Sequence, residues 1–166
     1  MSGIFSKVLF WFQAKNRHGI HSPFIYEFLD RAFYASPVKH GAGRRRLLRA
    51  AKMHFSPERV WTSTTLLPDS EILRDLNSDP TLQRPPFDLF VFENPAEIVM
   101  EILSDAGQRH NGSIVYLGNL RSSAPAYARW KEISTHPSVR VALETYWEGL
   151  LFFRKEQARQ HFKIRT

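Results

Sequence analysis

Two apolar segments near the end of the chain, residues 139–145 and 150–153, are joined only by residues 146–149. A crossover between parallel strands needs about a dozen residues or more, so a connection this short allows only an antiparallel hairpin. The hairpin therefore fixes one end of the expected sheet.

The segments before this hairpin alternate between strand patterns and helix patterns. The strand patterns cover residues 60–64, 87–92 and 113–118. Helical patterns lie between and after them, at residues 68–76, 94–106 and 123–135. This order predicts parallel strands with crossover helices. We expect an α/β fold, a sheet of about five strands that ends in an antiparallel hairpin.

The positive charge of the chain is concentrated in its first third. The net charge is +7, yet residues 1–59 carry 11 Lys and Arg against 3 Asp and Glu. Helical patterns cover residues 4–12, 22–33 and 44–54, with Ser22 as N-cap and Pro23 as first helical residue of the second. We therefore expect a basic helical extension over residues 1–56, followed by the α/β domain over 57–166.

A basic cluster follows the sequence Gly41-Ala42-Gly43. Its members are Arg44, Arg45, Arg46, Arg49 and Lys52. Backbone N–H groups and arginine side chains both favour anions, so the cluster is a candidate anion-binding site for phosphate or nucleic acid. A flexible loop before a solvated basic helix explains the same residues, and the sequence leaves these interpretations open.

The first helical segment, residues 4–12, is apolar on nearly all sides and stands beside Lys7, Lys15 and Arg17. Tryptophan and phenylalanine next to basic residues suit an anionic membrane surface, whereas packing on the sheet or on a partner protein explains the pattern equally. No apolar run reaches the roughly 18 to 20 residues of a membrane span, and no cleavable signal pattern is present. The sequence predicts a cytoplasmic protein, with the membrane periphery as the alternative.

The sequence also argues against cysteine chemistry and against metal binding. The chain has no cysteine, which excludes disulfides and thiolate nucleophiles. The histidines lack acidic neighbours at ligand spacing, so we expect no metal site.

Three pieces of sequence carry a resemblance to a known family. They are residues 14–24 (AKNRHGIHSPF), residues 130–137 (WKEISTHP) and residues 149–162 (GLLFFRKEQARQHF). They resemble the two ends of a bacterial subgroup of class I S-adenosylmethionine-dependent methyltransferases. The resemblance spans residues 14–34 and 87–164, and it implies a Rossmann-like sheet ending in an antiparallel strand, with S-adenosylmethionine as cofactor.

The middle of the chain departs from that family. Members resembling this chain have an acidic residue and a glycine-rich turn after the first strand, whereas here threonines and Pro68 occupy those places and no glycine occurs between Gly43 and Gly107. Threonine and proline resist the positive φ angles of a tight cofactor loop. Residues 68–86 are also too few for two further strand–helix units of about 30 residues each.

These departures predict a shortened, catalytically degenerate relative, a pseudoenzyme with weak or no S-adenosylmethionine binding. If the cofactor is held, the resemblance and the strand ends indicate a defined set of lining residues. The set consists of Thr62, Ser63, Thr64, Glu93, Asn94 and Asn119. Asn94 is also explained as a helix cap.

The alternative function is an interaction protein that uses residues 1–59 on an anionic membrane surface, nucleic acid or a partner protein. Loss of strands would expose a sheet edge, which the N-terminal helices or a second subunit must cover. We expect the helix over residues 24–33 to cover it.

Overall fold

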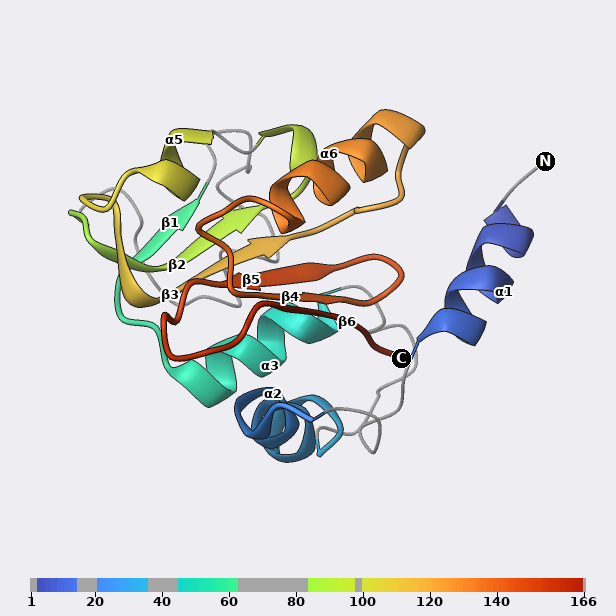
Figure 1. Cartoon of the computed structure of the whole chain (residues 1–166), viewed down its shortest axis with the longest axis horizontal. Helices are drawn as coiled ribbons and strands as arrows, with labels where there is room; N and C mark the ends of the chain where they lie inside the picture. Colours follow the sequence, from blue (N-terminus) through green and yellow to red (C-terminus); the bar gives the residue numbers. More distant parts are fainter. Residues whose placement is uncertain (1–2, 15–20, 36–44, 63–83, 98–99, 166) are drawn as a thin grey trace.

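The computed structural model describes residues 3–14, 21–35, 45–62, 84–97 and 100–165. In this part of the chain six strands form one mixed sheet in the order β1-β2-β3-β5-β4-β6 (Figure 1). The protein is therefore an α/β protein, as predicted. The expectation of about five strands was one strand short, because the edge strand β6 (Gln160–Lys163) has a single buried residue and no apolar pattern.

The parallel half of the sheet consists of β1 (Val60–Thr62), β2 (Phe87–Phe92) and β3 (Arg109–Leu117). The three strands run side by side in one direction, with Val60 opposite Leu89 and Leu89 opposite Ile114. Five of the six residues of β2 are buried, as expected for a strand covered on both faces. The strand patterns at 87–92 and 113–118 are confirmed, and β3 begins earlier than predicted. The predicted helix at residues 68–76 lies outside the described residues.

The predicted hairpin is confirmed. It joins β4 (Val141–Glu144) to β5 (Gly149–Phe152), and β5 pairs antiparallel to both β4 and β3. A Cβ atom on Gly149 would lie 2.6 Å from the ring of Trp130, so only glycine fits there. The unexpected strand β6 (Gln160–Lys163) pairs parallel to β4.

Helices cover both faces of the sheet (Figure 1). One face packs on α2 (Pro23–Phe28), the π-helical turn η2 (Leu29–Phe33) and α3 (Arg46–Phe55). The opposite face packs on α5 (Met100–Ser104) and α6 (Ala124–Ser134). Successive side chains of a strand point to opposite faces, so Leu89 and Val91 enter the first core and Phe90 and Phe92 the second.

The first of these cores joins parts of the chain on both sides of residue 56. Phe28, Phe33 and Leu48 pack in one cluster with Leu89 and Phe152 of the sheet. The division into segments 1–56 and 57–166 stays a prediction about sequence character, and in the structure the two segments share a hydrophobic core. The expectation that the helix over residues 24–33 covers a sheet edge was wrong, because its apolar side chains pack on a face of the sheet instead.

Ser22, Ser123 and Asn94 cap turns of the chain, and of these Ser22 and Asn94 were predicted as caps. Ser22 Oγ accepts the N–H of Ile25 at 3.4 Å, and Ser123 Oγ accepts the N–H of Ala126 at 3.2 Å. Asn94 Oδ1 accepts the N–H of Ala96 at 2.9 Å, but it begins only a 3-10 turn, η4 (Pro95–Glu97).

The helix predicted to run to Ala106 ends earlier, at Ser104. The guanidinium of Arg109 donates to the carbonyl groups of Ile102 at 3.2 Å and Leu103 at 2.8 Å. These carbonyls belong to the last turn of α5, where no helical partner is available. Arg109 thus satisfies the end of the shortened helix.

Candidate functional site

A small cavity lies at the carboxyl ends of β2 and β3, with a volume of about 110 Å³. Open α/β sheets hold their ligands at this edge. The lining residues come from the strand ends, from the start of α3 and from the β4–β5 turn. They are Arg45, Glu93, Tyr116, Gly118, Asn119, Trp147 and Glu148.

The structure brings two of the predicted site residues, Glu93 and Asn119, to this cavity. Asn119 has a left-handed backbone with φ of 48°, and its Nδ2 donates to the Glu93 carbonyl at 3.1 Å. A Cβ atom on Gly118 would lie 3.1 Å from the same carbonyl oxygen. The ends of β2 and β3 are therefore held together by backbone-directed contacts, and the Asn119 amide is part of that connection.

The other predicted cofactor residues lie elsewhere. Thr62 ends β1 and does not line the cavity. Asn94 does not line it either, and its side chain caps the turn η4. Ser63 and Thr64 lie outside the described residues.

A buried carboxylate that the sequence did not reveal forms one wall of the cavity. Glu148 is only 2% exposed, and both of its carboxylate oxygens accept the N–H of Leu47 at 3.2 Å. Leu47 is the second residue of α3, so the carboxylate sits at the positive end of that helix. The Tyr116 hydroxyl donates to Glu148 Oε1 at 3.1 Å. Glu148 thus caps α3 from the hairpin turn, 101 positions along the chain.

Burial is the largest influence on this carboxylate. It raises the pKa of Glu148 from 4.5 to about 7, although the hydrogen bonds from Leu47 and Tyr116 act in the opposite direction. The pKa of Tyr116 is raised well above its usual value, first by burial and then by the neighbouring Glu148. Tyr116 therefore remains a hydroxyl donor at neutral pH, whereas the carboxyl group of Glu148 titrates close to neutral pH.

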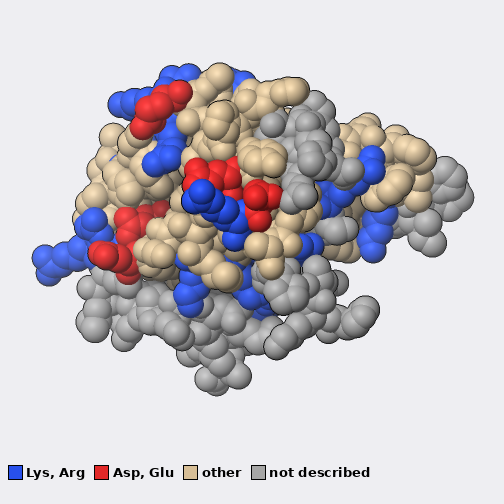
Figure 2. Space-filling model, turned by 90° about the horizontal axis from the view of Figure 1, so that it is seen from below, with Lys and Arg blue, Asp and Glu red and all other residues tan. Residues whose placement is uncertain are grey.

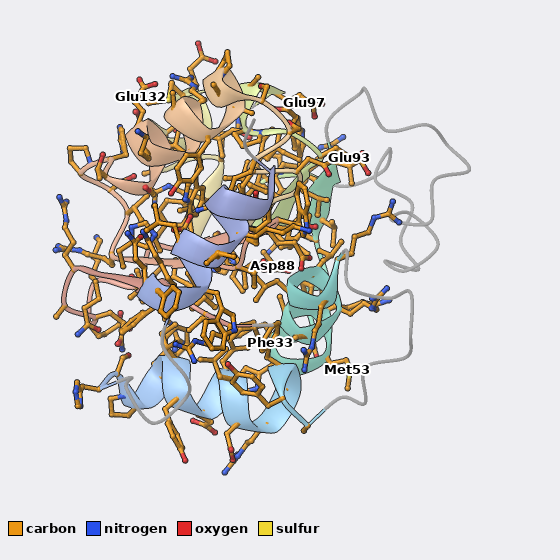
Figure 3. The ribbon with its side chains drawn as sticks, turned by 90° about the vertical axis from the view of Figure 1, so that its right-hand side faces the viewer. Phe33, Met53, Asp88, Glu93, Glu97 and Glu132 are labelled. Carbon is orange, nitrogen blue, oxygen red and sulfur yellow. The ribbon has the colours of Figure 1, made fainter. Side chains whose placement is uncertain are left out.

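The predicted anion-binding arginines are divided between two roles. Arg45 Nη2 lies 3.7 Å from Glu93 Oε1 at the cavity, and both side chains are partly exposed. Arg46 instead donates to the Phe33 carbonyl at 3.2 and 2.8 Å, and its guanidinium lies 4.3 Å from the Phe33 ring centre. Figure 3 shows Phe33 where η2 meets α3, and Glu93 higher, at the edge of the sheet.

The remaining members of the basic cluster do not define a site by themselves. Arg49 and Lys52 follow on α3, and Arg44 lies outside the described residues. The first N–H groups of a helix are the donors that a phosphate would use. Here the N–H of Leu47 is already bonded to Glu148.

A second buried carboxylate, Glu144, lies in the hairpin as the last residue of β4. Glu144 Oε2 accepts the indole N–H of Trp130 at 2.6 Å and lies 3.4 Å from Arg121 Nη2. Burial raises the pKa of Glu144, and the charges of Arg121 and Lys163 oppose that rise.

Among the described residues no group of three or more His, Asp or Glu could hold a metal ion.

The chain was compared with known proteins, and no family model, curated protein or solved structure matched it. Within the described ranges, no helix is long and apolar enough to cross a membrane.

Proposed function

We propose that this chain is a shortened methyltransferase-like domain that has lost catalysis and binds S-adenosylmethionine weakly or not at all. The strand directions support the proposal, because β1, β2 and β3 are parallel and β5 returns antiparallel beside β3. A Rossmann-like sheet with a reversed strand is the arrangement that the sequence resemblance implies.

The observation that carries the proposal is how the ligand edge of the sheet is filled. Glu148, Tyr116 and the start of α3 bond to one another there, and Arg45 pairs with Glu93 at the remaining space. That space is about 110 Å³, whereas small-molecule pockets usually enclose roughly 300 to 1,000 Å³. The chain's own polar groups thus take positions that a ligand would need.

Calorimetric titration with S-adenosylmethionine and S-adenosylhomocysteine tests this function. We expect no saturable binding at micromolar concentration for the wild type. Micromolar binding would contradict the proposal, and weakening of that binding by Glu93→Gln would assign it to the cavity. Glu132→Gln is the matched control, because Glu132 lies on α6 at the opposite side of the molecule from Glu93 (Figure 3).

We propose as a second function that the N-terminal region is an interaction surface, because α1 (Gly3–Gln13) presents large apolar side chains to solvent. Nucleic acid has less support as the partner, since Arg46 is engaged by Phe33 and Arg45 lies beside Glu93. Figure 2 shows acidic side chains interspersed with basic ones across the middle of the face seen from below. Replacing the exposed apolar side chains of α1 by polar ones should abolish binding of α1 to its partner. Binding that survives this replacement would contradict the second function.

A further inference from the structure

Helix α1 has apolar side chains on both its inner and its outer side. Phe10 and Ala14 are buried against the rest of the protein. Four large apolar side chains are exposed, and with about 100° of rotation per residue they cover roughly 160° of the helix opposite Phe10. They are Val8 (48% exposed), Leu9 (61%), Trp11 (52%) and Phe12 (71%). We call these four residues the outer face of α1.

The inner side is held by specific contacts, so the orientation of the outer face is defined. Phe10 packs edge-on against Tyr146, with ring centres 5.8 Å apart. Arg165 Nε donates to the carbonyl groups of Trp11 at 3.0 Å and Ala14 at 2.9 Å. Lys163 Nζ donates to Gln13 Oε1 at 2.7 Å. Figure 1 shows α1 at the margin of the molecule, with no labelled element beyond it.

Basic side chains lie along one side of the outer face, the side of Trp11. Lys7 lies over the rings of Tyr146 and Trp147, at 5.5 and 5.3 Å, and the Arg165 guanidinium lies 4.1 Å from the Trp11 ring centre. The α1 sequence contains no acidic residue. In Figure 2 the α1 end of the molecule, at the right, shows basic side chains and no acidic ones. The sequence adds Lys15 and Arg17 directly after α1.

We propose that the outer face of α1 docks on an anionic lipid bilayer, an inference that rests on the second proposed function. Apolar side chains on two opposite sides of a helix are typical of a helix that is buried on both sides. Tryptophan and phenylalanine suit the boundary between headgroups and acyl chains, and basic residues beside them are attracted to anionic headgroups. A second copy of the chain fits less well, because the basic side of the outer face, with Arg165 over Trp11, would then meet a surface of the same charge and not an anionic one.

Sedimentation of the full chain with phospholipid vesicles tests this inference. We expect at least about tenfold stronger binding to phosphatidylcholine vesicles that contain phosphatidylglycerol than to pure phosphatidylcholine, with a decrease at high salt. The double variant Leu9→Ser with Phe12→Ser should weaken binding at least about tenfold, because each side chain contributes apolar area. Met53→Ser is the matched control, since Met53 is 65% exposed on the distant helix α3.

Three outcomes would overturn the bilayer inference. The first is absence of wild-type binding to the anionic vesicles, and the second is equal binding by the wild type and the double variant. The third is self-association that the double variant abolishes while neither protein binds vesicles, which analytical ultracentrifugation would detect. This third result would leave an interaction function for α1 in place and assign its outer face to a second copy.

Discussion

Replacing the buried carboxylate Glu148 by its amide, Glu148→Gln, should change how the stability of the protein depends on pH. The pKa of Glu148 is about 7 in the folded protein, against 4.5 for an exposed glutamate. Between these values the folded chain binds more protons than the unfolded chain. The free energy of unfolding therefore falls as pH rises through this window, and the contribution of the protonated group is complete below pH 4.5.

The size of the effect follows from the same two values. The interval from 4.5 to about 7 corresponds to about 3 kcal/mol, at about 1.36 kcal/mol for each pKa unit. Glutamine has the shape of the protonated acid but does not titrate. The free energy of unfolding of the variant, measured relative to that of the wild type, should therefore rise by about 3 kcal/mol between pH 4.5 and pH 8.

Urea unfolding at several pH values measures this difference. His161 titrates in the same range with the opposite sign, because burial lowers its pKa to about 4 and its neutral form is favoured in the folded protein. Its contribution is lost as pH falls, but it is present in both chains and cancels in the difference. Glu101→Gln, at an exposed position on α5, is the control. A difference in unfolding free energy between wild type and variant that does not change with pH would show that burial does not raise the pKa of Glu148.

Two further substitutions test neighbouring contacts. Tyr116→Phe removes the 3.1 Å hydrogen bond that lowers the pKa of Glu148, so the upper end of the pH range in which stability falls should move upward. The free energy of unfolding should also fall by about 1 kcal/mol, and urea unfolding at several pH values checks both effects. Gly149→Ala places a Cβ atom 2.6 Å from the Trp130 ring, so it should cost about 1 to 3 kcal/mol and perturb tryptophan fluorescence, and unchanged urea and emission curves would be inconsistent with this packing.

Sequence patterns over a few neighbouring residues correctly predicted the strands and helix starts that depend only on those neighbours. The buried run at 87–92 became β2, and the short connection at 146–149 indicated the hairpin of β4 and β5. Ser22 and Ser123 marked helix starts, because a cap depends on residues within one turn. Strand β6 escaped prediction because its sequence, QHFK, has one buried apolar residue, Phe162.

The candidate site was predictable only where it depends on strand ends. Glu93 and Asn119 follow β2 and β3 directly, so their place at the sheet edge could be foreseen. Glu148 could not be found in this way, because its partner Leu47 is 101 positions away. Helix α3 also begins after Arg45, a residue with a φ of 72° and no side-chain cap bond, so no local pattern indicated that a distant carboxylate caps it.

The chain's own carboxylate, and not a ligand, occupies the start of α3. Amide NMR spectra that follow Leu47 test it most directly, because this N–H donates to Glu148. We predict that the Leu47 amide shifts with pH around a midpoint of about 7 and stays unchanged when S-adenosylmethionine is added. A Leu47 amide signal that does not change with pH but shifts on saturable cofactor binding would show that a ligand, and not Glu148, occupies the start of α3.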